Sequence, residues 1–149
     1  MKKIILLFFF VAFTLTEAYS AKSVASDEGL LAGLVDSFAV AMVKKDKVWM
    51  TNNLNDSCKM YDPSGVTLDK TSTIRTFTQG IYDIKKSASS NKSFLVNGSS
   101  AEGSVDYTVE GTGLINGDRM DITGTYKFSL KFKKSAKGWQ IAEILIINN

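Results

Sequence analysis

The stretch from Gly103 to Ile147 places the strongest constraint on the fold, because apolar and polar residues alternate along it with a period of two. Two tight turns, at Asn116-Gly117 and at 136–138, divide this stretch into three long strands. The clearest strand carries Ile122, Gly124, Tyr126, Phe128, Leu130 and Phe132 on its apolar side and Thr123, Thr125, Lys127, Ser129, Lys131 and Lys133 on its polar side. Alternation over this length predicts an antiparallel sheet with one buried and one solvated face.

Glycines within these strands predict that the sheet bends. Gly111, Gly113 and Gly124 occupy strand positions, where glycine commonly marks a bulge or a bend. A bent sheet with one apolar face needs other elements to cover that face.

Three helices are expected ahead of the sheet. The first begins at Ser26 and ends near Lys44-Lys45, the second is short and capped by Asp46, and the third is capped by Thr71 or Ser72. Apolar residues three and four apart define the buried stripe of each helix. The stripes are Leu30, Leu31, Leu34, Val35, Phe38 and Met42 in the first helix, Val48, Trp49 and Leu54 in the second, and Ile74, Phe77, Ile81 and Ile84 in the third.

The remaining segments are short strands, turns and one loop. They are a hairpin of Cys58–Tyr61 and Val66–Leu68 around the turn Asp62-Pro63-Ser64-Gly65, a loop over 85–92, a strand over 93–96 and a turn over 97–102. The loop is expected because 85–92 is rich in Ser, Ala and Asn. Helices separated from strands in this way predict an α+β domain, with three N-terminal helices packed on a strongly curved antiparallel sheet.

The first 20 residues have the pattern of a secretory signal peptide. A basic start at Lys2-Lys3 precedes an unbroken apolar run from Ile4 to Phe13, which is short for a membrane span and makes a retained anchor the weaker alternative. Small residues then favour cleavage after Ser20, with Ala18 and Ala21 as alternatives. We therefore expect an exported protein, periplasmic or secreted, with a single domain over 21–149 and no membrane span after cleavage.

Composition excludes several classes of function. Removal of Lys2, Lys3 and Glu17 lowers the 18 basic and 15 acidic residues to 16 and 14, a net charge of +2 without a strong basic cluster. Nucleic acid is therefore not an expected partner. The chain has no histidine and a single cysteine, Cys58, so it cannot form an internal disulfide, a serine triad or a Cys-His pair. We expect Cys58 to be buried among apolar side chains.

No cofactor or metal is expected either. The glycines at 111 and 113 lie within a strand rather than between a strand and a helix, so they form no phosphate-binding loop. The acidic residues are too scattered for a calcium loop, and the usual zinc ligands are missing.

The order of elements resembles the nuclear-transport-factor-2-like superfamily, a cone-shaped, cystatin-like α+β fold shared by ketosteroid isomerases and SnoaL-type polyketide cyclases. The resemblance covers about Ser26 to Ile147 and includes the turn at 62–65 and the ending Lys137-Gly138-Trp139-Gln140-Ile141-Ala142. It implies a pocket between the bent sheet and the helices. Active members commonly use an Asp-His pair, and this chain has no histidine.

Strand parity selects Glu143 as a candidate acid or base. If Trp139, Ile141 and Leu145 face inward, Glu143 shares their face, and burial among apolar groups would raise the pKa of its carboxyl. The alternative is that Glu143 lies in water at the mouth or pairs with a Lys or Arg. The opposite face, with Ala142, Ile144 and Ile146, is equally apolar, so the sequence leaves the orientation of this strand ambiguous. This second face could form a homodimer interface.

Tyr107 and Tyr126 lie on apolar strand faces and are candidate hydrogen-bond donors to a ligand or to Glu143. Core packing is the plainer interpretation for both. Asp62, next to Pro63, is expected to shape the turn. The residues predicted to line a pocket for a small apolar or aromatic ligand are Trp49, Tyr61, Phe77, Ile81, Tyr107, Tyr126, Phe128, Trp139 and Glu143.

Three functions remain open from the sequence. The first is an exported binding protein with an apolar pocket and no catalysis. The second is an isomerase or lyase that uses Glu143 as acid or base and Tyr107 or Tyr126 as donor. The third is a dimeric interaction module that associates through the outer sheet face.

Overall fold

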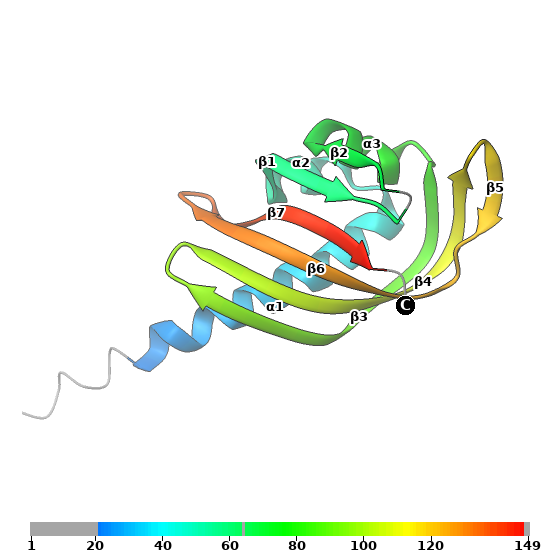
Figure 1. Ribbon diagram of the computed structural model, residues 1–149. Coiled ribbons are helices and arrows are strands. Elements are labelled where there is room, and N and C mark those ends of the chain that lie inside the picture. The colour runs from blue at the N-terminus through cyan, green and yellow to red at the C-terminus, as the bar shows by residue number, and fades with distance from the viewer. Residues whose placement is uncertain (1–20, 64, 148–149) are drawn as a thin grey trace, which may run out of the picture.

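The computed structural model describes the backbone of residues 21–63 and 65–147, and side chains from Asp27 onward with the exception of Ser64 (Figure 1). The predicted signal peptide, residues 1–20, lies outside the described residues. The elements in chain order are α1 (Ala21–Lys44), α2 (Lys47–Asn53), β1 (Leu54–Tyr61), β2 (Thr67–Asp69), α3 (Lys70–Thr78), β3 (Tyr82–Asn97), β4 (Ser100–Ile115), β5 (Asp118–Asp121), β6 (Gly124–Ser135) and β7 (Gly138–Ile147).

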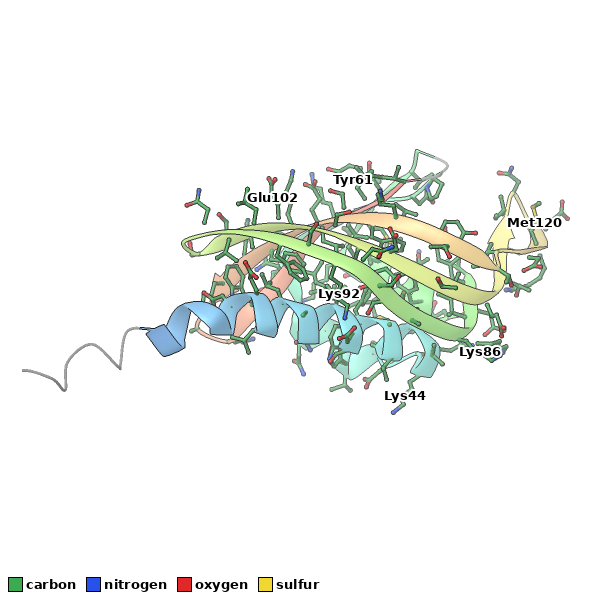
Figure 2. All side chains as sticks on the ribbon, turned by 90° about the horizontal axis from the view of Figure 1, so that it is seen from below. Lys44, Tyr61, Lys86, Lys92, Glu102 and Met120 are labelled. Carbon is green, nitrogen blue, oxygen red and sulfur yellow. The ribbon has the colours of Figure 1, made fainter. Side chains whose placement is uncertain are left out.

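The α+β class is confirmed, with three helices on one seven-stranded sheet. The strand order is β2-β1-β7-β6-β4-β3, and β5 pairs with β4 beside this path. All pairs are antiparallel except β1 with β7, so the sheet is mixed rather than purely antiparallel. Helix α1 runs along one face of the sheet (Figure 2), and the core lies between them.

Helix α1 begins at Ala21, earlier than the expected start at Ser26. Asp27 therefore lies inside the helix, where its carboxylate accepts hydrogen bonds from Trp139 Nε1 and Lys134 Nζ, both at 2.9 Å. These bonds join the helix to the β6–β7 turn. The buried stripe is as predicted except for Leu30, which is 56% exposed because its neighbour Leu31 occupies the inward position.

Helix α2 is capped by Asp46 as predicted, since Asp46 Oδ1 accepts from the backbone N of Trp49 at 2.8 Å. The buried residue of this helix is Met50, whereas Val48 is 71% exposed. The prediction that Leu54 belongs to α2 is wrong, because β1 begins at Leu54 rather than at Cys58. Leu54 pairs with Ile141 of β7, so the chain continues as a strand and α2 ends at Asn53.

Helix α3 is capped by Asp69, not by Thr71 or Ser72. The Asp69 carboxylate accepts from the backbone N of Ser72 at 2.8 Å. The helix ends at Thr78 before Gly80, whose positive φ of 77° suits glycine. The predicted stripe therefore ends too late, because Ile81 follows the helix and Ile84 lies in β3.

The loop predicted over 85–92 is instead the middle of β3, which pairs with β4 over most of its length. Its Ser and Asn residues are tolerated because β3 is an edge strand, and two of them, Ser89 and Asn91, bond to the neighbouring α1 and β4. Ser89 donates to Asp36 of α1, and Lys92 forms an ion pair with the same carboxylate at 2.5 Å. The predicted turn over 97–102 contracts to the two residues between β3 and β4.

The Asn116-Gly117 turn is confirmed, with φ of 52° and 91° at its two residues. The strand after it differs from the prediction. The chain first forms β5, which pairs only with β4, and then leaves the sheet at Ile122 before β6 begins at Gly124. The last third therefore contains four strands, of which β5 is short.

A bulge at Ala142 sets the orientation of β7. Lys131 pairs with Glu143 and Phe132 pairs with Ile141, so Ala142 has no partner on β6. The extra residue reverses the side-chain parity along the strand. Trp139 and Ile141 face the core before the bulge, and the buried residues after it are Ile144 and Ile146. Glu143 and Leu145 lie on the outer face, and the prediction that they share the face of Trp139 is wrong.

The same bulge removes the predicted dimer face. Ile144 is fully buried and Ile146 is 8% exposed in the core, so neither residue is available to a partner subunit.

Cys58 is buried as expected, and burial raises the pKa of its thiol to about 12. Among the described residues, none of the helices is both long enough and apolar enough to span a bilayer.

Candidate functional site

A cavity of about 570 Å³ lies on the helix-covered face of the sheet. Its walls come from the end of α3, the start of β3, the β1–β2 turn, the β4–β5 hairpin, β6 and β7. Most of the surface is apolar, and the apolar residues that line it include Phe77, Ile81, Ile84, Val109, Phe128 and Ile146. The alternation in β4, β6 and β7 directs these side chains inward, where α3 and α1 leave the space unfilled.

Three exposed apolar side chains surround the opening of this cavity. Val66 in the β1–β2 turn is 49% exposed, and Leu114 and Ile115 at the end of β4 are 44% and 37% exposed. The contact of these apolar side chains with water is unfavourable, and a bound apolar molecule would cover part of their surface.

The polar groups of the cavity are few and mostly hydrogen-bonded within the protein. The Thr76 hydroxyl donates to Ser72 O at 2.9 Å, and the Tyr126 hydroxyl donates to Ile122 O at 2.9 Å. The Tyr126 oxygen keeps its capacity to accept a bond from a ligand.

Asp62 shapes the turn between β1 and β2, as predicted. Its Oδ1 accepts from the backbone N of Val66 at 3.0 Å, and its backbone N donates to Val66 O at 3.1 Å. The turn holds the half-buried carboxyl group of Asp62 at the cavity wall.

Tyr82 is a cavity residue that sequence reasoning missed. It pairs with Gly113 across β3 and β4, and its ring lies over that glycine, where a Cβ would come within 3.1 Å of Tyr82 Cδ1. Its hydroxyl has no hydrogen-bond partner among the described residues. Burial raises the pKa of Tyr82, and the nearby Asp62 and Tyr126 raise it further. An aromatic residue opposite a glycine on the neighbouring strand is a known pattern. The sequence alone did not show which residue faces Gly113, because that depends on the register of β3 against β4.

Four of the predicted pocket residues line this cavity: Phe77, Ile81, Tyr126 and Phe128. Trp49 instead packs on Phe38 in the core, with ring centroids 6.0 Å apart. Trp139 lies at the far end of the sheet with Asp27.

Tyr107 is a core residue. It is fully buried, its hydroxyl donates to Val35 O at 2.9 Å, and burial raises its pKa far above the ordinary value. The plainer interpretation of Tyr107 is therefore confirmed, and this side chain cannot exchange a proton with a ligand in the cavity.

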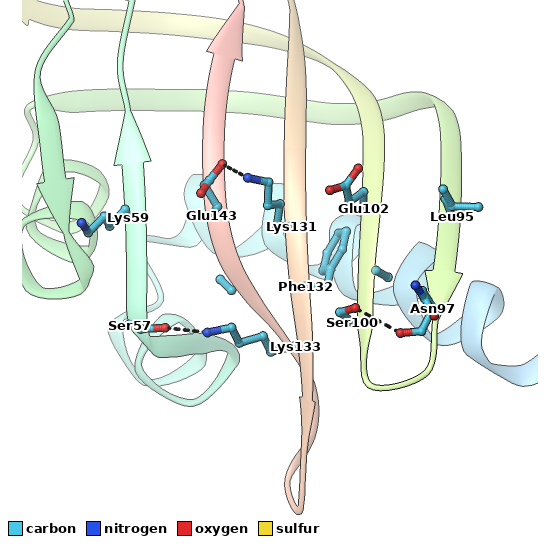
Figure 3. A pocket seen from close by; sticks show the side chains of 12 residues that line it. Ser57, Lys59, Leu95, Asn97, Ser100, Glu102, Lys131, Phe132, Lys133 and Glu143 are labelled. Atoms are coloured by element: carbon cyan, nitrogen blue, oxygen red, sulfur yellow. Dashed lines mark hydrogen bonds and ion pairs between the residues drawn. The ribbon is translucent and has the colours of Figure 1, made fainter.

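Glu143 lies in a second hollow, a groove of about 450 Å³ on the outer face of the sheet (Figure 3). Its carboxylate pairs with Lys131 Nζ at 2.9 Å, and this pairing raises the pKa of Lys131. In register across the strands, Lys59, Glu143, Lys131 and Glu102 form a row of alternating charge. Such cross-strand pairs stabilise the register of a sheet. Tyr61, at the end of β1, is paired with Leu145 and lines neither hollow.

The predicted catalytic pair is therefore not assembled. Glu143 and Tyr126 lie on opposite faces of the sheet, because the outer groove contains the first and the inner cavity the second. The described residues contain no cluster of three or more Cys, Asp or Glu side chains arranged to hold a metal ion.

The sequence matches no protein-family model and no curated protein, but the structure resembles many solved ones. An NTF2-like protein from Cytophaga hutchinsonii is 15% identical, with a TM-score of 0.73 over 81% of this chain and 97% of that one. An NTF2-like protein of unknown function in nutrient uptake from Rhodospirillum rubrum is 16% identical, with a TM-score of 0.67 over 78% and 95%. An NTF2-like protein with a cystatin-like fold from Novosphingobium aromaticivorans is 10% identical, with a TM-score of 0.64 over 90% and 89%.

Proposed function

We propose that this chain, which has the nuclear-transport-factor-2-like fold, binds a small apolar or aromatic molecule in the inner cavity without transforming it. The observation that carries the proposal is the cavity itself, about 570 Å³ with mainly apolar walls. Ligand sites commonly measure about 300–1,000 Å³ and combine apolar walls with a few oriented polar groups.

The fold does not decide between binding and catalysis, because this scaffold hosts both. Catalysis of the isomerase or lyase kind needs a carboxylate that can accept a proton from the substrate. The predicted acid or base, Glu143, lies in the outer groove and pairs with Lys131, so it does not face the cavity. The carboxylate that lines the cavity is that of Asp62, and it takes part in the β1–β2 turn through Oδ1. We therefore favour binding over catalysis. The interaction module is disfavoured because its apolar face, Ile144 and Ile146, is part of the core.

We also propose that the protein acts outside the cytoplasm, in the periplasm or the medium. This rests on the basic start, the apolar run and the small residues of 1–20. The ligand would then be a molecule that the cell meets, takes up or releases across its envelope.

A tryptophan placed in the cavity tests the binding proposal. Ile81 lines the cavity and is half-buried, so the variant Ile81→Trp is expected to occupy ligand space without overpacking the centre of the core. The wild-type mature protein is expected to bind the neutral dye Nile red at one site, with a dissociation constant on the order of micromolar. In Ile81→Trp the affinity is expected to fall by about tenfold or more.

The matched control is Leu95→Trp. Leu95 is 71% exposed in the outer groove, so this variant adds the same side chain away from the cavity and is expected to bind Nile red as the wild type does. Thermal unfolding of both variants checks that they are folded. Equal dye affinity in wild type and Ile81→Trp would show that the dye binds elsewhere and would contradict the proposal.

A further inference from the structure

We propose that the cavity selects neutral or cationic apolar molecules with a hydrogen-bonding head group and discriminates against organic carboxylates. This inference rests on the proposed function and adds the chemical class of the ligand. It is carried by two of the polar side chains that line the cavity, Asp62 and Tyr82.

The formal charge of the cavity wall is negative. Of the described residues that line it, Asp62 is the single one with a formal charge. The basic side chain on the neighbouring hairpin, Arg119, turns its guanidinium to Gly80 O at 3.0 Å and to Thr112 Oγ1 at 3.4 Å, and it does not line the cavity. A carboxylate ligand would therefore meet the like charge of Asp62, and the described residues that line the cavity include no Lys or Arg to attract it. The apolar groups of the wall weaken the screening of this repulsion by water.

Tyr82 supplies the hydrogen bond that a neutral head group needs. Gly113 leaves room for its ring beside Phe77, with ring centroids 5.8 Å apart, and so fixes the direction of the side chain. Among the described residues the Tyr82 hydroxyl has no hydrogen-bond partner. A phenolic hydroxyl both donates and accepts, so it can bond to an alcohol, a ketone or an amine.

Both side chains line the same cavity. The negative charge of Asp62 contributes to the raised pKa of the Tyr82 hydroxyl, as does the neighbouring Tyr126. An alcohol or ammonium group at this position could donate toward the Asp62 carboxylate and bond to the Tyr82 oxygen, while its hydrocarbon part contacts Phe77 and Phe128.

Three ligands with the same ten-carbon chain test the selectivity. We would measure displacement of Nile red by 1-decanol, decylamine and decanoate at neutral pH, each below its solubility limit and below the concentration at which it aggregates. Decanol and decylamine are expected to displace the dye at concentrations about tenfold lower than decanoate, because only decanoate carries a charge of the same sign as Asp62.

Two variants, with a third as control, assign the effect to Asp62 and Tyr82. Asp62→Asn removes the charge but keeps an Oδ1 that can accept from Val66 N, so the turn is retained, and decanoate is expected to approach decanol in affinity. Glu102→Gln removes a negative charge from the outer groove, away from the cavity. It is expected to leave the order of affinity of the three ligands unchanged. Tyr82→Phe is expected to weaken decanol several-fold.

The outcomes separate this inference from the function on which it rests. If Nile red binds but decanoate displaces it as well as decanol does, or if Asp62→Asn leaves the order of the ligands unchanged, the selectivity is overturned and ligand binding stands. If the wild-type protein binds neither Nile red nor any of the three ligands, the proposed function is contradicted and this inference falls with it.

Discussion

Replacing Ile144 with alanine is expected to lower the free energy of unfolding by about 3–4 kcal/mol. Ile144 is fully buried behind the β7 bulge, and its removal would leave a cavity in the centre of the core. Equilibrium unfolding in urea measures the loss of free energy. If the slope of the unfolding free energy against urea concentration is the same in the variant and the wild type, both expose the same surface on unfolding and the two free energies can be compared.

The adjacent residue is the control. Leu145 is 40% exposed on the outer face, so Leu145→Ala is expected to cost less than about 1 kcal/mol. Without the bulge at Ala142 the order would be reversed, because Leu145 would share the face of Trp139 and Ile141. A larger loss for Leu145→Ala than for Ile144→Ala would therefore contradict the register of β7.

Gly111→Ala is expected to lower the free energy of unfolding by about 2–3 kcal/mol. A Cβ at Gly111 would lie 2.4 Å from Asp83 O and 2.9 Å from Ile84 Cα. Both are backbone atoms of β3, so the clash cannot be relieved by rotating a side chain. The neighbouring irregularity of β3, between Ile84 and Lys86, would have to shift. Thermal and urea unfolding both report the loss.

Gly124→Ala is the matched control for this prediction, since Gly124 is also a strand glycine. Its Cβ would meet only the Tyr126 ring, at 3.7 Å or more, which is ordinary contact. Alanine also restricts the unfolded chain more than glycine does, so the variant is expected to be neutral or to gain about 0.5 kcal/mol. Equal losses at Gly111 and Gly124 would show that the close approach of β3 to Gly111 is not the cause.

The sequence predicted the parts of the fold in which pattern and burial coincide. In β6, alternation alone places Phe128, Leu130 and Phe132 in the core, and all three are buried. The Asn116-Gly117 turn was predictable for a similar local reason, because its positive φ values suit these residue types.

The orientation of β7 was not predictable, because both of its faces are apolar and a single unpaired residue decides between them. Ala142 has no feature that marks it as a bulge, and the bulge is visible only against the partner residues of β6. Most of strand β3 was missed for a related reason, since only its end was predicted, as the strand over 93–96. Its Ser, Asn and Lys residues are typical of a loop, and the pairing with β4 and the contacts with α1 overcome that local preference.

The candidate site also has one part that the sequence predicted and one part that it did not. Phe77, Ile81, Tyr126 and Phe128 were predicted to line a pocket from their places in amphipathic elements, and they line the cavity. The polar end of the cavity depends on contacts between distant segments. Tyr82 reaches it through its register with Gly113, and Asp62 through the approach of the β1–β2 turn, and neither contact leaves a mark in local periodicity.

The most direct test of a filled cavity is native mass spectrometry of the protein purified from the compartment in which we propose that it acts, the periplasm or the medium. The account predicts a chain that begins at residue 21 and carries the reproducible extra mass of a bound small molecule. The extra mass should disappear on denaturation and be absent from Ile81→Trp. A wild-type protein without any added mass, at twice the chain mass, would contradict the account and indicate an interaction module instead.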